Sequence, residues 1–166
     1  LEDRVKDRAR IDQLEQKIIQ LKQKHKRIWY MADGIYSMYG DFSPVDKIVE
    51  LMDKYKELHY YVDDAHGMSC FGNKGQGSVL KNRDIHPKMI LATSFAKAFA
   101  TGGGVLVFPN ETIAQKVRNC GGPFNSSGPM QPASLGAAIA CADLHLNGEI
   151  ENYQLELREK VLYTQL

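Results

Sequence analysis

Short runs of β-forming residues alternate with segments of helical pattern along this chain, and this alternation constrains the fold more than any other feature. Four apolar runs predict strands, at residues 28–32, 60–62, 89–92 and 103–108. The segments around them predict helices, at residues 1–26, 44–52, 110–118, 133–146 and 150–166. Strands that alternate with helices at this spacing pair mostly in parallel. The sequence therefore predicts an α/β fold, with a mostly parallel sheet flanked by helices in an α/β/α arrangement.

The composition narrows the classes of protein to which the chain can belong. Of its 166 residues 43% are hydrophobic and 25% charged, as in ordinary globular domains, and the net charge is +1. A balance so near neutrality gives no reason to expect nucleic acid or an anionic membrane surface as a partner. No apolar run approaches the roughly 20 residues needed to span a bilayer. Cys70, Cys120 and Cys141 form no CxxC pair, so we expect reduced thiols in a cytoplasmic protein.

The first 27 residues form a charged segment with an apolar stripe. The stripe is spaced mostly by three or four positions and consists of Val5, Ile11, Leu14, Ile18 and Leu21. Two interpretations stay open: a helix that covers the sheet, or a partner-binding helix that makes the chain a non-catalytic interaction module. The segment holds fewer than the roughly three to four heptads of a coiled coil, which favours the covering helix. The basic run at residues 22–27 is expected to be the solvated end of this helix.

Local signals predict where the other helices begin and end. Ser43 and Pro44 are expected as the N-cap and first position of one helix, and Asn110 as the cap of another. Gly148 is expected to stop the long helix that precedes it. The stretch at residues 121–129 is rich in Gly, Pro and Ser and predicts an irregular loop.

A β-rich run ends abruptly at residues 63–67, whose sequence is D-D-A-H-G. Charged groups at the end of a buried strand lie where open α/β sheets bind ligands. Three kinds of site fit two acids and a histidine there: a metal site, a structural acid pair that caps the loop, or a cofactor pocket in which a carboxylate pairs with a protonated ring nitrogen. No further cluster of His, Asp or Glu lies near in sequence, so we predict no metal.

Lys97 is a lone lysine among small and apolar residues, just after the third predicted strand. If Phe95, Phe99 and the alanines around it exclude water, they favour the neutral amine, which is the form that attacks a carbonyl. The alternative is an ordinary surface lysine in an alanine-rich segment. Thr93 and Ser94 supply hydroxyls that can bind phosphate oxygens. Neither GxGxxG nor GxxxxGK[ST] is present, which disfavours a dinucleotide or a nucleoside triphosphate.

Four motifs in the same order resemble the α-oxoamine synthase group of fold-type I pyridoxal 5′-phosphate (PLP) enzymes. Residues 63–67 look like the D-D-A-H-G signature of that group, and D-G-I-Y-S-M-Y-G-D at residues 33–41 is similar to its (D/E)-G-(V/I)-x-S-M-x-G-D segment. S-F-A-K-A-F at residues 94–99 matches its [ST]-x-x-K-[AS]-[LF] segment, and residues 123–132 are similar to its P-F-x-F-S-T-x-x-x-P loop. Four motifs in order are a far more specific signal than any one of them.

The resemblance implies catalytic roles for three of the matched residues. Lys97 would bind the aldehyde of PLP covalently and later move the α-proton of the substrate. Asp63 would pair with the pyridinium nitrogen and keep it protonated, so that the ring can take up electrons. His66 would hydrogen-bond the phenolic oxygen of the ring. Of the two neighbouring acids, Asp64 is expected to be structural.

Three serines complete the cofactor site that the resemblance implies. Ser37 would lie near His66, and Ser94 would bind the phosphate. Ser127 would reach the phosphate of a partner subunit, because family sites lie at the interface of a homodimer. The residue after Ser127 is a glycine where the family usually has a hydroxyl, and the two residues before it depart from the usual apolar pair.

The resemblance covers only part of the family's chain. We expect an N-terminal amphipathic helix in residues 1–27, part of the PLP-binding large domain in residues 28–147, and in residues 148–166 a helix leading toward a C-terminal domain that is missing here. The parent is expected to be a PLP-dependent acyltransferase that condenses an amino acid with an acyl-CoA or other acyl thioester, usually with decarboxylation. The alternative is an aminotransferase or another fold-type I enzyme, although aminotransferases commonly carry Tyr where this chain has His66. This segment alone is expected neither to bind PLP well nor to catalyse.

Overall fold

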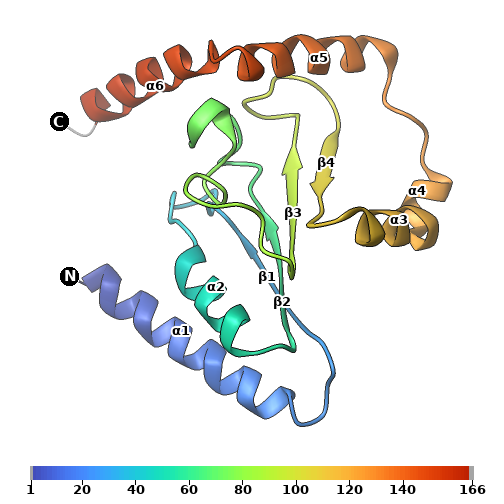
Figure 1. The fold of residues 1–166 in the computed structure, drawn as a ribbon. Coiled ribbons are helices and arrows are strands. Elements are labelled where there is room, and N and C mark those ends of the chain that lie inside the picture. The colour runs from blue at the N-terminus through green and yellow to red at the C-terminus, as the bar shows by residue number, and fades with distance from the viewer. Residues whose placement is uncertain (1, 165–166) are drawn as a thin grey trace.

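The computed structural model describes the backbone of residues 2–164 and the side chains of residues 10–164. Helices and strands alternate along the chain and then give way to helices alone (Figure 1). The elements in chain order are α1 (Glu2–Leu21), β1 (Ile28–Asp33), α2 (Val45–Lys54), β2 (Leu58–Asp63), η1 (Asn73–Gly75), β3 (Met89–Ser94), β4 (Gly104–Val107), α3 (Glu111–Cys120), α4 (Gly122–Ser126), α5 (Pro132–Leu146) and α6 (Ile150–Thr164).

The four strands form one mixed sheet in the order β1-β2-β3-β4. β1, β2 and β3 are parallel, and β4 pairs antiparallel with β3. The register places Asp33 beside Asp63 and Asp63 beside Ala92, so β1 and β2 end level and β3 runs two residues further. The predicted α/β fold with a mostly parallel sheet flanked by helices is confirmed.

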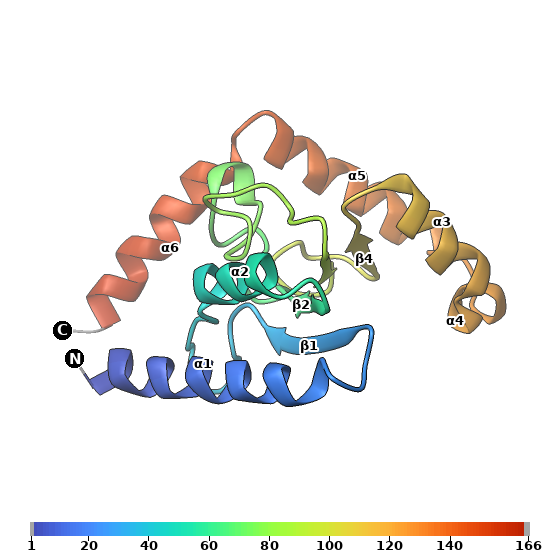
Figure 2. The ribbon, with the colours of Figure 1, turned by 60° about the horizontal axis from the view of Figure 1, so that its bottom comes forward.

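The hydrophobic core lies where α1 and α2 pack on one side of the sheet. Figure 2 shows α1 along one edge of the molecule and α5 and α6 along the opposite edge, with α2 and the sheet between them. Alternate residues of a strand point to the same face, which is why every second residue of β2 is buried. The fully buried apolar side chains of this core are Ile18, Ile48, Met52, Leu58, Tyr60, Val62, Val79 and Met89.

Helix α1 covers the sheet, as the first interpretation of its apolar stripe predicted. Ile18 is fully buried, and Ile11 and Leu14 pack against the same core. Glu15 ties the helix to the end of α2, because its Oε1 accepts hydrogen bonds from Lys54 Nζ (2.6 Å) and Tyr55 OH (2.7 Å). Val5, also on the predicted stripe, lies outside the residues whose side chains are described. Ile11, Leu14 and Ile18 of the stripe therefore pack within the fold.

Several predicted helix boundaries differ from the observed ones. Helix α1 ends at Leu21, so the basic run after it forms the connection to β1 rather than a helix end. Ser43 is not an N-cap: the helix begins at Val45, with Pro44 before it and no side-chain cap. The Ser43 hydroxyl instead lies 3.0 Å from Tyr60 OH inside the core, where burial raises the pKa of Tyr60.

The signals for the later helices were mostly right. Asn110 caps α3 as predicted, because its side chain accepts a hydrogen bond from the Ile113 N–H (3.0 Å). The stretch predicted to be irregular contains the short helix α4, whose first turn accommodates Pro123. Helix α5 ends at Leu146, two residues before Gly148, whose φ of +85° cannot continue a helix.

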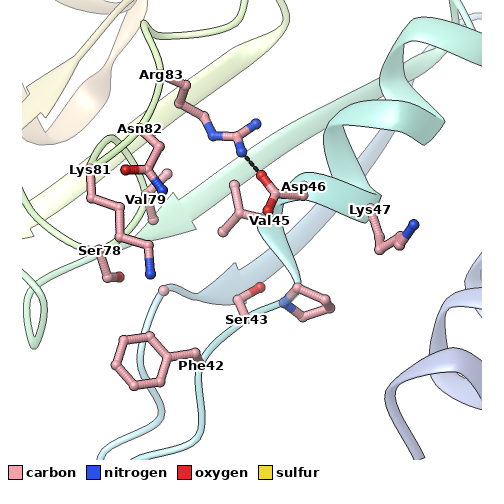
Figure 3. Close-up of a pocket in the computed structure, with 12 residues that line it drawn as sticks. Phe42, Ser43, Val45, Asp46, Lys47, Ser78, Val79, Lys81, Asn82 and Arg83 are labelled. Atoms are coloured by element: carbon pink, nitrogen blue, oxygen red, sulfur yellow. Dashed lines mark ion pairs between the residues drawn. The ribbon is translucent and has the colours of Figure 1, made fainter. Parts of the chain in front are cut away.

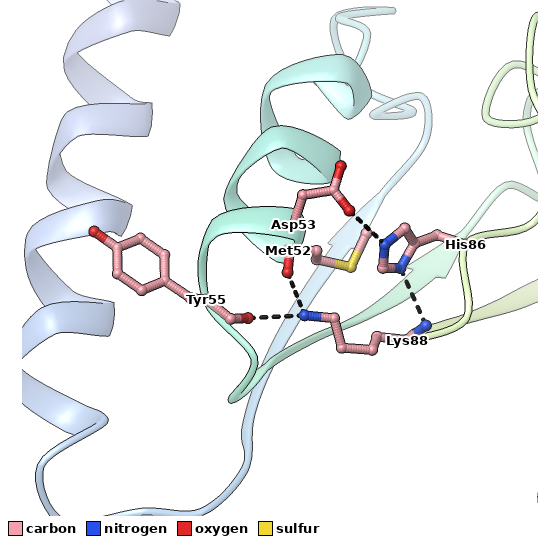
Figure 4. A network of polar contacts seen from close by, with 5 residues as sticks. All are labelled: Met52, Asp53, Tyr55, His86 and Lys88. Atoms are coloured by element: carbon pink, nitrogen blue, oxygen red, sulfur yellow. Dashed lines mark hydrogen bonds and ion pairs between the residues drawn. The ribbon is translucent and has the colours of Figure 1, made fainter.

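At the amino end of β3, Lys88 ties this strand to the end of α2 (Figure 4). Its ammonium donates to the carbonyls of Met52 and Tyr55, the second at 2.8 Å, and so satisfies carbonyls that a helix end leaves free. His86 adds a second tie: Nε2 lies 3.1 Å from Asp53 Oδ1, and Nδ1 accepts from the Lys88 N–H at 3.1 Å. Burial lowers the pKa of Lys88. These contacts join the amino end of β3 to the end of α2.

The opposite end of the sheet lies below α5 and α6, which run past the carboxyl ends of the parallel strands (Figure 1). Lys74, in the loop after β2, donates from Nζ to the Leu146 carbonyl at the end of α5 (2.7 Å). Gln154 of α6 donates from Nε2 to the carbonyls of Ser69 (2.9 Å) and Gly72 (3.1 Å) in the same loop. None of the described helices is long and apolar enough to cross a membrane.

Candidate functional site at the carboxyl ends of the strands

The sheet brings the predicted catalytic residues to one edge. Asp63 is the last residue of β2 and pairs in register with Ala92, two residues before β3 ends at Ser94. His66 follows β2 by three residues, and Lys97 follows β3 by three. Because β2 and β3 are parallel neighbours, the two loops leave the sheet side by side, as expected at the ligand-binding end of an α/β sheet.

Lys97 and His66 are in direct contact. Lys97 Nζ lies 2.8 Å from His66 Nε2, a hydrogen-bond distance. An ammonium has donors only, so a protonated Lys97 requires a neutral imidazole whose Nε2 accepts. The lysine side chain is exposed and the histidine half-buried. This pair can therefore pass a proton between a lysine amine and an imidazole while the amine stays open to a ligand.

The expected exclusion of water from Lys97 is wrong for the described chain. Phe95 and Phe99 do not enclose the amine; their rings stack on each other at 4.6 Å between centroids, and Phe99 also stacks on His145 at 4.9 Å. A tight turn directs Lys97 outward: the Ala100 N–H donates to the Lys97 carbonyl at 2.8 Å, and Ala100 has a φ of +57°. The apolar neighbours therefore hold the backbone at Lys97 in place but do not shield its amine from water.

Asp63 presents a carboxylate at the end of β2. Its side chain is exposed, and its Oδ1 accepts the Ala65 N–H at 2.9 Å. This bond fixes the side chain against its own loop, on backbone that the sheet holds rigid. An exposed, oriented carboxylate one strand away from an amine is suited to a cation on a ligand that spans both.

Asp64 has a different environment, although it follows Asp63 directly. It is 1% exposed, and its carboxylate accepts from Ser78 Oγ at 2.5 Å and from the Val79 N–H at 3.0 Å. Burial raises the pKa of Asp64, against the opposing effect of these hydrogen bonds. The residue fastens the loop after β2 to the segment that follows it, and has no open face toward a ligand.

Three glycines make room for the Asp64 carboxylate. A Cβ at Gly34, Gly67 or Gly77 would lie 2.2 to 2.4 Å from an Asp64 oxygen, far inside van der Waals contact. Gly34 lies in the loop after β1, and Gly67 and Gly77 lie in the loop after β2. The glycines of the motifs D-G and D-D-A-H-G thus both leave room for the same buried carboxylate, a structural role that sequence reasoning missed. In the sequence only Gly67 lies close to Asp64, so no local signal pointed to Gly34 and Gly77.

Thr93 and Ser94, the two hydroxyls considered for phosphate binding, lie on opposite faces of β3, because successive residues of a strand alternate. Ser94 is partly exposed, and its Oγ accepts the Ala96 N–H at 3.1 Å, which leaves its own proton free to donate. Thr93 is 7% exposed, and its Oγ1 is buried with no hydrogen-bond partner among the described residues. Ser94 is therefore the hydroxyl that an approaching ligand can reach.

No described contact joins Ser37 or Ser127 to the pair of Lys97 and His66. Ser37 is exposed in the loop after β1, where it lines a hollow of about 510 Å³ with Asp33 and Tyr36 among others. Ser127 is exposed directly after α4, which lies beyond β4 in Figure 1. The structure thus groups Asp63, His66 and Lys97 with Ser94, while these two serines lie apart.

A separate pocket of about 250 Å³ lies beside the start of α2 (Figure 3). Ser78 and Val79, which bind Asp64, form part of its wall, and Arg83 forms an ion pair with Asp46 on its rim. Lys97, His66 and Asp63 are not among its lining residues. This pocket lies behind the Asp64 loop and is distinct from the edge that carries the amine.

The residues at the sheet edge fit PLP by their chemistry. An exposed amine suits an aldehyde, an oriented carboxylate suits a protonated ring nitrogen, and an imidazole suits a phenolic oxygen. The structure supplies all three, in Lys97, Asp63 and His66, on adjacent strand ends. The Ser94 hydroxyl lies on the same edge as a donor for phosphate.

Comparison with known proteins supports PLP as the cofactor. The chain is 33% identical to a serine palmitoyltransferase of Bacteriovorax stolpii over 129 residues, 76% of this chain and 30% of that protein. It is 30% identical to the 8-amino-7-oxononanoate synthase of a Marinomonas species over 134 residues, 80% of this chain and 33% of that protein. A solved serine palmitoyltransferase of Sphingomonas wittichii has the same fold, with a TM-score of 0.78 at 22% identity over 90% of this chain and 36% of its own. Other solved serine palmitoyltransferases of this fold contain PLP.

The family model for aminotransferase class I and II matches residues 3–166, which is nearly the whole chain. The chain spans about a third of the length of the curated relatives that it matches. These relatives, serine palmitoyltransferase and 8-amino-7-oxononanoate synthase, are α-oxoamine synthases, the group that the four motifs resemble. The chain belongs to the aminotransferase class I and II family.

Proposed function

We propose that this chain is part of a PLP-dependent acyltransferase, which condenses an amino acid with an acyl-CoA or other acyl thioester, usually with decarboxylation. The observation that carries the proposal is the contact of Lys97 Nζ with His66 Nε2 at 2.8 Å. This contact joins the loop after β3 to the loop after β2, the strand that ends at Asp63. A lysine, an acid and a histidine on adjacent strand ends are the groups that such an enzyme needs. The relatives named above act in the same reaction class.

When bound, PLP supplies an electron-accepting ring that stabilises charge at the α-carbon of an amino acid. Lys97 would hold the aldehyde end of the cofactor, and its amine would be the base that moves the α-proton of the substrate. A neutral His66 accepts a hydrogen bond at Nε2 from Lys97 Nζ at 2.8 Å, which holds the amine in position. The Asp63 carboxylate binds the protonated ring nitrogen, and the Ser94 hydroxyl donates to the phosphate.

We assign Ser37 and Ser127 supporting roles in the same proposal. With PLP bound, Ser37 would lie near His66 and the phenolic oxygen, and Ser127 would reach the phosphate of a partner subunit in a homodimer. The exposed position of Ser127 after α4, apart from its own Lys97 segment, is consistent with a contact made across an interface. Cys70, Cys120 and Cys141 are free thiols, which suits a cytoplasmic enzyme.

Product analysis separates this function from the alternative, an aminotransferase. The whole protein would be incubated with PLP, a panel of amino acids and a panel of acyl-CoA thioesters, with free CoA and keto acid both measured. Release of CoA that depends on the amino acid and is lost in Lys97→Ala supports the acyltransferase. Keto-acid formation without CoA release would identify an aminotransferase instead.

A further inference from the structure

His145 is a buried histidine near the end of α5, and neither the motifs nor the proposed reaction gives it a role. It is 7% exposed and has a hydrogen-bond partner on each ring nitrogen. Nδ1 lies 2.7 Å from the Cys141 carbonyl oxygen, and Nε2 lies 2.9 Å from Ser69 Oγ. A carbonyl only accepts, so Nδ1 donates to it, and Nε2 shares a hydrogen bond with the Ser69 hydroxyl. The ring is thus held in one orientation by a partner on each nitrogen.

The partner on one side, Ser69, belongs to the loop that carries His66. Ser69 is 4% exposed and has a φ of +69°, a left-handed conformation that is sparsely populated for serine. Its N–H donates to the Gly75 carbonyl at 2.8 Å, and its carbonyl accepts from Gln154 Nε2 at 2.9 Å. Such a conformation persists only where the surroundings hold it. The bond to His145 is one of the contacts that do so.

The contact on the other side, Phe99, belongs to the segment that carries Lys97. Its ring stacks on the His145 ring with 4.9 Å between centroids and 30° between planes. Phe99 is 5% exposed and follows Lys97 by two residues. Gly75 closes the packing, because a Cβ there would lie 2.7 Å from the His145 ring. One imidazole therefore contacts both segments that meet at the site.

We propose that His145 is a positioning residue that sets the distance between Lys97 and His66. The inference rests on the proposed function, which places these two residues in the reaction. The hydrogen bond to Ser69 holds the loop of His66, and the stack on Phe99 holds the turn of Lys97. Rotating or removing the ring releases one segment from the other, and the 2.8 Å contact is lost. Helix α5, far along the chain, thereby controls how readily the lysine amine reacts.

The test measures the reactivity of Lys97 in the whole protein. His145→Phe keeps a ring for Phe99 and removes the hydrogen-bond partner of Ser69, while Ser69→Gly removes the hydroxyl and relieves the positive φ. The rate at which PLP is trapped on Lys97 by borohydride would be measured against pH by peptide mapping. A misplaced reacting group costs up to about a hundredfold, so we expect each variant to slow trapping by about tenfold or more and to move the pH profile. His86→Phe, at the opposite end of the sheet, is the matched control and should leave both unchanged.

The alternative is that His145 only stabilises the fold. In that case His145→Phe lowers the thermal stability as His86→Phe does, with trapping at the wild-type rate and pH profile, and the proposal is overturned. Ser69→Gly decides the matter if His145→Phe does not fold. If wild type shows no trapping on Lys97, the proposed function fails, and NMR titration of the His66 ring in the cofactor-free protein decides the inference. A His66 titration that His145→Phe leaves unmoved would overturn it; a displaced titration supports it.

Discussion

At the scale of single residues, the adjacent acids Asp63 and Asp64 differ in role because one is exposed and the other buried. Asp63 is exposed at a strand end, whereas Asp64 is enclosed by Ser78, Val79 and three glycines. Only the first can meet a ligand. The second holds together the loop from which His66 projects.

Substitution of the two acids should therefore affect different properties. In the whole protein Asp63→Ala is expected to lower kcat by at least about a hundredfold, because a preorganised charge at the ring nitrogen is lost, with little change in stability. Asp64→Asn should lower the free energy of unfolding by about 1–3 kcal/mol, because an amide cannot accept from both Ser78 and Val79, and should retain more activity. Steady-state kinetics and urea unfolding on both variants measure the two effects. The reverse pattern would show that the roles of the acids are exchanged.

The burial of Asp64 also predicts a pH dependence of stability. Burial raises its pKa, so the folded state keeps the proton at pH values where the unfolded chain, with a pKa of about 3.9, has lost it. In that window the stability of wild type falls as pH rises, whereas an asparagine does not titrate. The stability difference between wild type and Asp64→Asn should therefore shrink as pH rises from about 4 toward neutrality. Urea unfolding at a series of pH values measures it, and a difference that grows with pH contradicts this account.

The sequence predicted these residues better than it predicted their surroundings. Spacing and motif placed Asp63, His66 and Lys97 at or just after strand ends, where the structure has them, because local pattern sets where these strands end. The exposure of Lys97 was not predictable, because the direction of Phe99 depends on His145, which comes from a helix much later in the chain. Ser43 failed as a cap for the same kind of reason: Tyr60, distant in sequence, takes its hydroxyl.

At the scale of elements, Gly34, Gly67 and Gly77 lie so close to the Asp64 carboxylate that a side chain has no room there. Substitution should therefore cost more stability at these glycines than at glycines in open space. Gly67→Ala would place a methyl group 2.2 Å from Asp64 Oδ1 and 2.7 Å from the Ser78 backbone nitrogen. Because backbone cannot move aside as a side chain does, we expect a loss of about 1–3 kcal/mol in the free energy of unfolding. Gly136→Ala in α5 is the control: a Cβ there meets nothing within 4 Å, and the helix should gain up to about 1 kcal/mol. Equal effects at the two positions would argue against the close packing around Asp64.

Helix α1 is predicted to act as part of the fold rather than as a partner-binding element. Ile18 is fully buried against α2 and the sheet, while its neighbour Ile19 is 44% exposed. Ile18→Ala should therefore lower the free energy of unfolding by about 2–5 kcal/mol, and Ile19→Ala should change it little. Denaturant unfolding of the two variants makes the comparison. Sedimentation of the same variants is a second check, because loss of self-association with unchanged stability would restore the partner-helix interpretation.

Element type and order followed from periodicity, but some details did not. The four strands and the long helices were predicted because their apolar spacing is local. β4 runs antiparallel to β3 after a connection of residues 95–103, and spacing alone does not give the direction of a strand. Helix α4 was missed because Gly, Pro and Ser usually signal a loop, although Pro is well suited to a first helical turn.

At the scale of the whole molecule, the two ends of the sheet have different tasks. The amino ends of the strands are closed by structural bonds, with Lys88 on the carbonyls of α2 and His86 on Asp53. The carboxyl ends carry Asp63, His66 and Lys97, and Lys74 and Gln154 join the loop after β2 to α5 and α6. Asp63 and Lys97 stay exposed there, while buried Asp64 holds the loop behind them.

The central claim is that Lys97 is the residue that binds PLP, and borohydride trapping in the whole protein tests it most directly. The protein would be mixed with PLP, reduced, digested and mapped by mass spectrometry, together with Lys97→Ala and, as a control at an exposed helix lysine, Lys116→Ala. This account predicts one saturable adduct on the peptide that contains Lys97, absent from Lys97→Ala and unchanged in Lys116→Ala. An adduct that forms equally well in Lys97→Ala, or that maps to another lysine, would contradict it.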